Sequence, residues 1–334
     1  MKKSLMTLGV LALFVLMAYG QEKKFALYSV AFYNMENLFD TIHDEGKNDY
    51  EYLPNGTNQW NTMKYKAKLK NMSEILSLLS TDKLPLGPAI IGVSEIENYR
   101  VLEDILKQPA LADRGYQYVH YEGADQRGVD CAFFYNPKLF ELTNSKLVPY
   151  VYINDTVHKT RGFLIASGNI AGEKMHFIVN HWPSRAAASP ARERAGEQVR
   201  AIKDSLLRED SAAKIVIMGD MNDDPMDKSM AVALGAKRKP ADVGPTDLYN
   251  PWWDTLKKGY GTLMYKGKWN LFDQIVFTGN LLGTDRSTLK FYKHEIFRRD
   301  FMFQKEGKYK GYPKRTQAGG VWLNGYSDHL PTII

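Results

Sequence analysis

Apolar and polar positions follow two different periods along the chain, and together they predict a mixture of helices and strands. Residues 65–80 place Leu69, Met72, Ile75, Leu76 and Leu79 at helical spacing. The segments 101–111 and 192–209 show the same period and predict two further helices. Shorter segments rich in β-branched and aromatic residues are typical of strands, and they span 25–34, 88–95, 116–122, 129–137, 146–153, 162–170, 173–181, 213–220, 271–279 and a last strand from 327 onward.

The order of these elements predicts a single α/β domain over residues 21–334. We find no internal repeat, no low-complexity segment and no linker rich in Pro or Ser that would divide it. Many strands with only a few helices favour two packed sheets covered by helices.

The first twenty residues have a different pattern, which is typical of a secretory signal peptide. Lys2 and Lys3 precede an uncharged run from Leu8 to Met17, and small residues follow at 18 and 20. The run is short for a membrane span, although an uncleaved anchor is the alternative. We therefore expect an exported protein, periplasmic or secreted, with no stable membrane insertion after cleavage of residues 1–20.

Composition and charge add little to this picture. The chain of 334 residues is 44% hydrophobic and 25% charged, which is ordinary for a globular protein. Its formal net charge is +6, and loss of Lys2 and Lys3 with the signal peptide would leave +4, which suits an anionic substrate without requiring one. The single cysteine, Cys131, excludes an internal disulfide framework and is expected in the core.

Polar residues recur where the predicted strands end. Carboxylates, amides and imidazoles in such a position suit a site that holds Mg²⁺ and a phosphate, because Mg²⁺ prefers oxygen ligands. The alternative for each one alone is a turn or a strand cap. The residues are Asn34, Glu36, Glu95, Glu97, His181, Asp220, Asn222, Asp328 and His329.

Seven motifs, taken in order, resemble the endonuclease/exonuclease/phosphatase superfamily over residues 27 to 332. They are FYNMEN (32–37), GVSEIEN (92–98), RGVDCAFFY (127–135), VNHWPSR (179–185), GDMND (219–223), LFDQIVF (271–277) and YSDHLP (326–331). The resemblance implies a deoxyribonuclease I-like fold, a four-layer sandwich of two packed, mostly antiparallel sheets flanked by helices. It also implies a metal-dependent phosphoric ester hydrolase.

The resemblance implies a divalent metal site near the first two motifs. Glu95 corresponds to the main metal ligand, with Glu36 and Asp328 close to the ion. Glu97 is the alternative ligand, because SEIEN offers two acids, and it could instead cap the next helix. Mg²⁺ is the expected cofactor, with Mn²⁺ or Ca²⁺ as alternatives.

The GDMND motif implies the residues on the side of the attacking water. Asp220 would orient or deprotonate the water, and Asn222 would hold the water or a phosphate oxygen. Asn34 would orient Asp220 or the phosphate.

Two histidines are implied on the side of the phosphate. His329 would donate to a non-bridging oxygen or protonate the leaving group, and Asp273 would fix its tautomer. His181 would be the second phosphate-side histidine, and Asp130 resembles its carboxylate partner.

Residues that would contact the substrate are less clearly indicated. Arg185 and Arg161 are candidates for phosphate contacts, with surface ion pairs as the alternative. Trp269 and Asn270 precede Asp273 and would lie at the rim. The segment 297–317 carries seven Lys or Arg and five aromatic residues. It suits a nucleic-acid backbone, or it is a solvated hairpin whose aromatics pack on the core.

Three functions are consistent with these residues. The first is an exported, metal-dependent phosphodiesterase, a nuclease that cleaves nucleic acid by in-line attack of water. The second is a phosphatase or phospholipase-like hydrolase of inositol phosphates, sphingomyelin or another small phosphoester. The third, a binding protein on an inactive scaffold, is disfavoured because the acids and both histidines are present. We expect a monomer.

Overall fold

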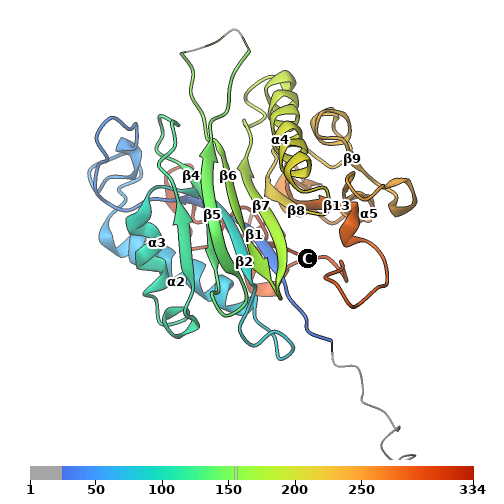
Figure 1. Ribbon diagram of the computed structural model, residues 1–334. Helices are drawn as coiled ribbons and strands as arrows, with labels where there is room; N and C mark the ends of the chain where they lie inside the picture. The colour runs from blue at the N-terminus through green and yellow to red at the C-terminus, as the bar shows by residue number, and fades with distance from the viewer. Residues whose placement is uncertain (1–24, 154, 156) are drawn as a thin grey trace, which may run out of the picture.

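The computed structural model describes residues 25–153, 155 and 157–334, and its core is two sheets packed face to face (Figure 1). The predicted signal peptide, residues 1–20, lies outside the described residues. No helix among the residues described has both the length and the apolar character needed to cross a membrane.

The first sheet has six strands, of which only β1 and β2 pair in parallel. Their order across the sheet is β14 (Glu295–Ile296), β17 (Thr332–Ile333), β1 (Val30–Leu38), β2 (Ile90–Ile96), β4 (Asp130–Tyr135) and β3 (Gln117–His120).

The second sheet has seven strands, and its parallel pairs are β7 with β8 and β9 with β10. The order is β5 (Glu141–Val148), β6 (Phe163–Ile170), β7 (Glu173–His181), β8 (Lys214–Asp220), β13 (Asp273–Thr278), β10 (Leu248–Tyr249) and β9 (Ala236–Lys237). The other neighbours are antiparallel, so the predicted mostly antiparallel sheets are confirmed.

The helices form the two outer layers. Helices α2 (Thr62–Leu78) and α3 (Tyr99–Leu106) bury their apolar faces on the first sheet. On the other side, α4 (Ser189–Glu209) covers the second sheet, and the short α5 (Trp253–Lys257) lies near its edge (Figure 1). This arrangement confirms the predicted four-layer sandwich.

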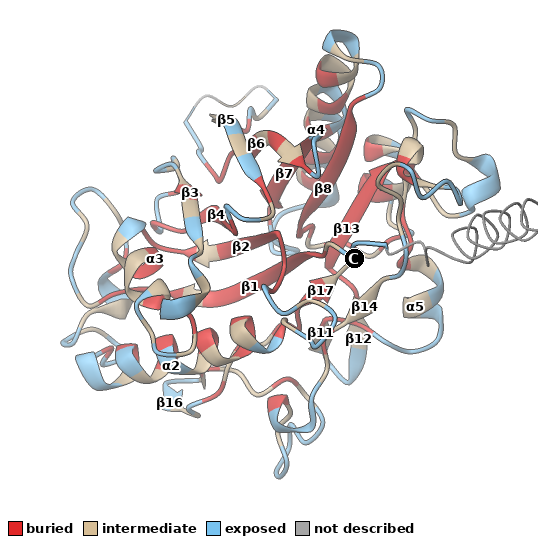
Figure 2. Ribbon diagram, turned by 60° about the horizontal axis from the view of Figure 1, so that its bottom comes forward, coloured by how far each residue is buried: buried red, intermediate tan, exposed pale blue. Residues whose placement is uncertain are grey.

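The central core lies between the sheets, whose central strands consist largely of buried residues (Figure 2). Phe32 and Phe133 of the first sheet and Phe177 and Met218 of the second are completely buried there. Cys131 is also buried and is a free thiol, as expected for a small core residue.

Several strands begin or end at other residues than the pattern of apolar and polar side chains predicted. The strand expected at 25–34 spans Val30–Leu38, and β5 ends at Val148 because Pro149 has no N–H for the ladder. The last strand is only Thr332–Ile333. Two hairpins were not predicted: β11 (Leu263–Tyr265) with β12 (Lys268–Asn270), and β15 (Gln317–Ala318) with β16 (Val321–Trp322).

Candidate active site

Strand topology gathers the polar strand ends at one place. The parallel pair of β1 and β2 brings the segment after Asn34 next to Glu95, and the parallel pair of β7 and β8 sets His181 opposite Asp220. Strand β13 runs antiparallel to β8, so its first residue, Asp273, also lies opposite Asp220. Contacts of β1 and β2 with β8 bring the two sheets together at this edge.

The backbone is unusual at these strand ends. Glu36, Asn37, Glu95 and Asn222 have φ values of 46°, 51°, 58° and 52°, in the left-handed region that side chains other than glycine rarely occupy. The ladders of β1 with β2 and of β2 with β4 shift register at the same places. Such bulges redirect side chains, and here they lie beside the clustered polar residues.

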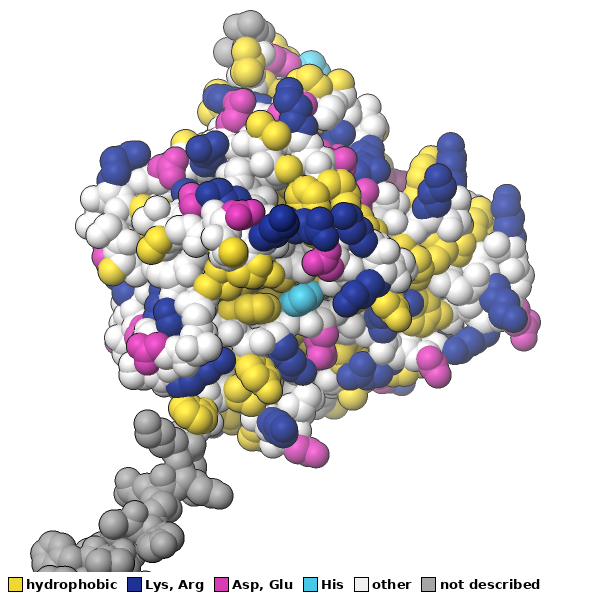
Figure 3. Space-filling model, turned by 90° about the vertical axis from the view of Figure 1, so that its right-hand side faces the viewer, with side chains coloured by type: hydrophobic (Ala, Val, Ile, Leu, Met, Phe, Trp, Pro, Cys, Tyr) yellow, Lys and Arg dark blue, Asp and Glu magenta, His cyan; other side chains and the backbone are white. Residues whose placement is uncertain are grey.

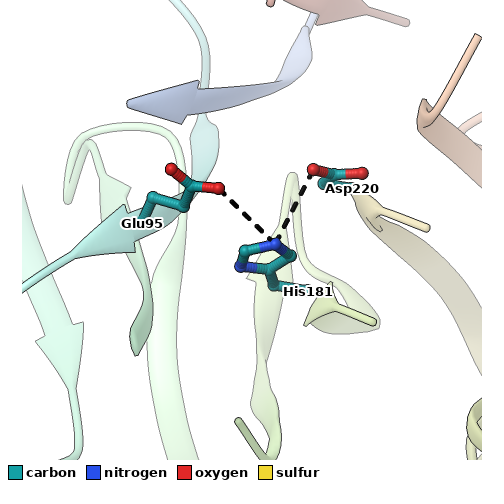
Figure 4. Close-up of side chains that lie close together, drawn as sticks. All are labelled: Glu95, His181 and Asp220. Atoms are coloured by element: carbon teal, nitrogen blue, oxygen red, sulfur yellow. Dashed lines mark ion pairs between the residues drawn. The ribbon is translucent and has the colours of Figure 1, made fainter. Parts of the chain in front are cut away.

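Glu95, His181 and Asp220 converge from three strands (Figure 4). Nε2 of His181 lies 3.7 Å from Oε1 of Glu95 and 3.7 Å from Oδ2 of Asp220. Both distances exceed those of a hydrogen bond, so the imidazole sits between two carboxylates without bonding to either.

Asn34 links the two carboxylates. Its Nδ2 donates to Oε1 of Glu95 at 3.2 Å and to Oδ2 of Asp220 at 3.1 Å. Its Oδ1 accepts from the backbone N of Glu36, which fixes the orientation of the amide. Asn34 therefore lies where the sequence predicted, against Asp220.

Asp220 is buried at the end of β8. Burial, together with the nearby charges of Asp273 and Glu95, raises its pKa to about 7, although His329 opposes the shift. The backbone N of Asn222 donates to Oδ1 of Asp220 at 2.9 Å, whereas the side-chain amide of Asn222 donates to the carbonyl of Trp182 at 3.1 Å.

His329 and Asp273 form the pair that the motifs implied. Nδ1 of His329 lies 2.7 Å from Oδ2 of Asp273, and its Nε2 lies 3.9 Å from Oδ2 of Asp220. Burial alone would lower the pKa of His329, but Asp273 and Asp220 outweigh it and hold the pKa well above the usual value. His329 is therefore an imidazolium at neutral pH, with Nε2 as the donor that faces the site.

His181 is in the opposite state. Burial, together with the charges of Arg161 and Arg127, lowers its pKa well below the usual value, so this imidazole is neutral. The predicted pairing with Asp130 is wrong, because Oδ2 of Asp130 accepts from His120 at 3.2 Å and from the backbone N of Gly123 at 3.0 Å. Nδ1 of His181 is buried and has no hydrogen-bond partner among the described residues.

Glu36 and Asp328 are joined by a cation of the protein itself. Arg315 donates to Oε1 of Glu36 and to Oδ2 of Asp328, each at 2.8 Å. The backbone N of Thr316 donates to the other oxygen of Glu36, and Nζ of the fully buried Lys68 lies 3.9 Å from it. Of the three acids predicted around the ion, Glu95 alone lies between His181 and Asn34, and the other two face Arg315.

Glu97 lies apart from this cluster. Its carboxylate accepts from the backbone N of Asp40 at 2.7 Å and is almost completely buried. The cap of α3 is Asn98, whose Oδ1 accepts from the backbone N of Arg100, so the suggestion that Glu97 caps this helix is wrong.

The two arginines predicted to contact substrate are both ion-paired. Arg161 has a side chain only 7% exposed, and it donates to Asp125 and to the carbonyl of Trp182. Arg161 therefore holds the backbone directly after β7 and is not placed to reach a substrate. Arg185 is 42% exposed, but its guanidinium pairs with Asp223, Asp224 and Asp227.

Trp269 and Asn270 lie on β12, at the rim as predicted. Strand β12 pairs with β11, and Leu263 of β11 forms a bridge with His329. Oδ1 of Asn270 accepts from Arg185 at 3.3 Å, while the Trp269 ring packs edge-on against Phe303 at 6.3 Å.

The donors present fit a divalent metal ion. Glu95, His181 and Asp220 each offer a ligand atom, and these atoms all lie within 4.8 Å of one another. The carboxylate oxygens of Glu95 and Asp220 are suitable ligands for Mg²⁺ or Mn²⁺, whereas the imidazole nitrogen of His181 is a ligand type that transition metals prefer. A second group with the same spacing, His120, Glu122 and Asp130, includes Asp130, the residue that was expected beside His181.

Lys68 and Arg315 are the site residues that the sequence analysis missed. Lys68 precedes Leu69 and lies four residues before Met72, on the apolar face of α2. A lysine on this face interrupts the row of apolar residues, and that interruption was visible in the sequence. Arg315 carried no local signal, because its partners lie 279 and 13 residues away in the chain.

Comparison with known proteins identifies the family. The sequence profile of the Endonuclease/Exonuclease/phosphatase family matches residues 29–334. The chain belongs to this family. It is therefore a phosphoester hydrolase of a fold whose members depend on metal ions. No curated protein sequence matches the chain.

Solved structures of the same fold cover most of this family member. TDP2 from D. rerio in complex with a single-strand DNA product is 14% identical with a TM-score of 0.54, covering 92% of this chain and 97% of its own. The human Nocturnin catalytic domain is 15% identical with a TM-score of 0.52, covering 92% and 92%. A mannosyl-6-phosphatase from Bacteroides thetaiotaomicron is 15% identical with a TM-score of 0.53, covering 92% and 98%. At these identities the likeness establishes the fold alone.

Proposed function

We propose that this family member is an exported phosphodiesterase that depends on a divalent metal ion and hydrolyses nucleic acid by in-line attack of water. The observation that carries the proposal is the arrangement around Asp220. One carboxylate lies between a neutral imidazole, His181, and an imidazolium, His329, and Asn34 links it to Glu95.

The residues around Asp220 have different roles in the reaction. Asp220, which lies between the two histidines, orients the attacking water and accepts its proton. His329 donates from Nε2 to a phosphate oxygen as negative charge develops there, and Asp273 keeps that donor protonated. Glu95 and Asp220, with His181, would hold the metal ion, which supplies positive charge to the phosphate.

Nucleic acid is the substrate class that the net charge of the chain and one structural relative favour. The chain is basic overall, and Lys and Arg side chains are spread over the face that lies on the right in Figure 1 (Figure 3). The structural relative TDP2 was solved with a single-strand DNA product. The alternative, a hydrolase of a small phosphoester, is favoured by the mannosyl-6-phosphatase of the same fold.

A substrate panel tests this choice. Protein from Gln21 onward would be assayed with Mg²⁺, Mn²⁺, Ca²⁺ or EDTA on single-stranded DNA, duplex DNA, RNA, bis-p-nitrophenyl phosphate, inositol phosphates, sphingomyelin and mannose 6-phosphate. We expect metal-dependent cleavage of nucleic acid and of bis-p-nitrophenyl phosphate. Turnover of only sugar or inositol phosphates, or of lipid, would replace the nuclease with the alternative.

Variants in the same assay test the mechanism. Asp220→Asn and His329→Ala should each lose about 100- to 1000-fold in rate, because each removes a group that acts in the transition state. Asp285→Asn, at an exposed aspartate outside the cluster, is the matched control. Full activity in Asp220→Asn would contradict the assignment.

Export and oligomeric state are part of the proposal. The pattern of residues 1–20 supports export followed by cleavage, so N-terminal sequencing of exported protein should start after Gly20. We expect a monomer by light scattering. An intact N-terminus in the membrane fraction would instead indicate an anchor.

A further inference from the structure

A hollow of about 420 Å³ opens beside β12, outside the cluster of acids and histidines. One wall is Trp269, and the segment after β14 forms the rest. Its lining combines three cations with two aromatic rings and one acid. The residues are Trp269, Arg298, Asp300, Phe303, Gln304, Lys305, Lys310 and Gly311.

Arg298 is held in this wall by aromatic rings. Its guanidinium carbon lies 4.7 Å from the ring centre of Trp269, 5.1 Å from that of Phe303 and 5.4 Å from that of Tyr260. These contacts fix the plane of the guanidinium, and a fixed guanidinium presents two parallel donors to a phosphate.

The same guanidinium has no anion beside it. Nη1 of Arg298 is buried without a hydrogen-bond partner, and no carboxylate of the described residues lies within 4.0 Å of the side chain. Arg185 and Arg315, by contrast, are each paired with more than one acid. Because Arg298 lines the hollow and its positive charge has no acid beside it, an anionic ligand in the hollow would supply the missing partner.

The two lysines extend the positive charge along one loop. Lys305 and Lys310 form no ion pair with an acid of the described residues. Their loop is tied down at both ends, because Gln304 and Tyr312 pair through their backbones and the Tyr312 hydroxyl accepts from the backbone N of Gly267. The hollow is thus a built feature of a fixed loop, with Asp300 as its only acid.

Strand pairing connects the hollow to the proposed active site. Met264 of β11 pairs with Trp269 of β12, and the neighbouring Leu263 forms a bridge with His329. Two strand spacings separate His329 from Trp269, which is roughly 10 Å. A substrate long enough to span that distance can occupy both places.

We propose that this hollow binds a neighbouring nucleotide of single-stranded nucleic acid while the scissile phosphate lies at His329. The inference rests on the proposed nuclease function and specifies its substrate. Arg298, Lys305 and Lys310 take a backbone phosphate, and exposed rings of Tyr260, Tyr265 and Tyr309 offer stacking surfaces for bases. A small sugar phosphate has no second group to reach the hollow.

The test compares a long and a short substrate. Arg298→Met keeps an unbranched apolar side chain against the rings and removes the charge. With a labelled single-stranded oligonucleotide in EDTA, we expect about tenfold weaker binding by anisotropy, and a salt slope reduced by about 1. Hydrolysis of bis-p-nitrophenyl phosphate with Mn²⁺ should stay within about twofold of wild type, because this substrate is too small to reach the hollow.

Two further variants keep the result interpretable. Arg286→Met removes an exposed arginine and should change neither measurement. Arg286 lies far from the site, because its neighbour Thr288 bonds to Lys214, at the opposite end of β8 from Asp220. If Arg298→Met does not fold, Lys305→Gln/Lys310→Gln carries the test, with a similar loss of binding expected.

The outcomes separate the two proposals. Undetectable oligonucleotide binding by wild type, equal binding by the Arg298 or double-lysine variant, or tighter binding of the matching duplex would overturn the single-strand subsite. Failure of wild type to hydrolyse bis-p-nitrophenyl phosphate with any metal ion would instead overturn the proposed phosphodiesterase.

Discussion

At the scale of single residues, Asp273 controls the charge of His329. The two side chains meet at 2.7 Å in a buried site, and the pair keeps the imidazole protonated at neutral pH. His181, which lacks such a partner, is neutral. Two histidines at one site therefore have opposite roles, because only one of them is bonded to a carboxylate.

Asp273→Asn should move the pH profile of the reaction. The asparagine cannot stabilise the imidazolium, so the pKa of His329 falls. Activity that needs the protonated imidazole is lost as pH rises through that pKa, and the alkaline limb should therefore shift to lower pH. The measurement is kcat/KM for bis-p-nitrophenyl phosphate across pH 5 to 10; an unshifted limb with reduced amplitude would show that Asp273 acts only in positioning.

The buried carboxyl group of Glu97 leads to a prediction about stability rather than activity. Burial, and then the charge of Asp40, raises its pKa to about 9, so the folded protein holds a proton that the unfolded chain releases above about pH 4.5. Folding stability must then fall as pH rises between these two values, by up to ~1.4 kcal/mol per pH unit from this group.

Glu97→Gln should remove that dependence and stabilise the protein at pH 8, because the amide oxygen can still accept from the backbone N of Asp40. Urea denaturation at pH 5 and pH 8 measures the difference between variant and wild type. The same difference at both pH values would contradict a protonated Glu97.

At the scale of elements, close approach of β7 and β8 places Asp220. A Cβ on Gly219 would lie 2.3 Å from the carbonyl oxygen of Asn180, the residue opposite it on β7. The strand next to the reactive carboxylate therefore depends on the absence of a side chain, whereas the clash of a Cβ on Gly92 would be with the flexible side chain of Met218.

Gly219→Ala should lower the free energy of unfolding by ~1–3 kcal/mol, because backbone must move, and it should reduce activity by displacing Asp220. Gly92→Ala is the matched comparison and should cost less, since a methionine adapts readily. Urea midpoints measure both. Equal midpoints would show that the two sheets accommodate a methyl group equally at these positions.

At the scale of the whole molecule, two sheets and three strands must meet to complete the metal-binding group. Glu95 comes from the first sheet and His181 and Asp220 from the second, so an ion bound there joins the two sheets. Binding to the folded state alone stabilises it by mass action.

Mn²⁺ should therefore raise the unfolding free energy of wild type, by ~2.7 kcal/mol at one hundred times its dissociation constant, and EDTA should reverse the effect. Glu95→Gln should lose this stabilisation. Glu122→Gln, in the neighbouring group of His120 and Asp130, should keep it. Thermal unfolding measures all three, and loss only in Glu122→Gln would place the ion in that second group.

Local properties of the sequence determined the longer strands, the long helices and the identity of the polar residues at strand ends. Helical spacing in 65–80 and the apolar run before Asp220 depend only on neighbouring residues, and both appear in the structure as α2 and β8. The order of the seven motifs was sufficient to predict the family and its four-layer fold. The family resemblance also implied the pairing of His329 with Asp273, and the two side chains meet in the structure.

For several other side chains, tertiary structure alone decided the partners. Asp130 bonds to His120 instead of His181, Arg315 joins Glu36 to Asp328, and Arg161 is buried against Asp125. Each of these contacts depends on how far a side chain reaches across sheets and loops after packing. Charge, burial and pKa are properties of that packed arrangement, so no local pattern in the chain specifies them.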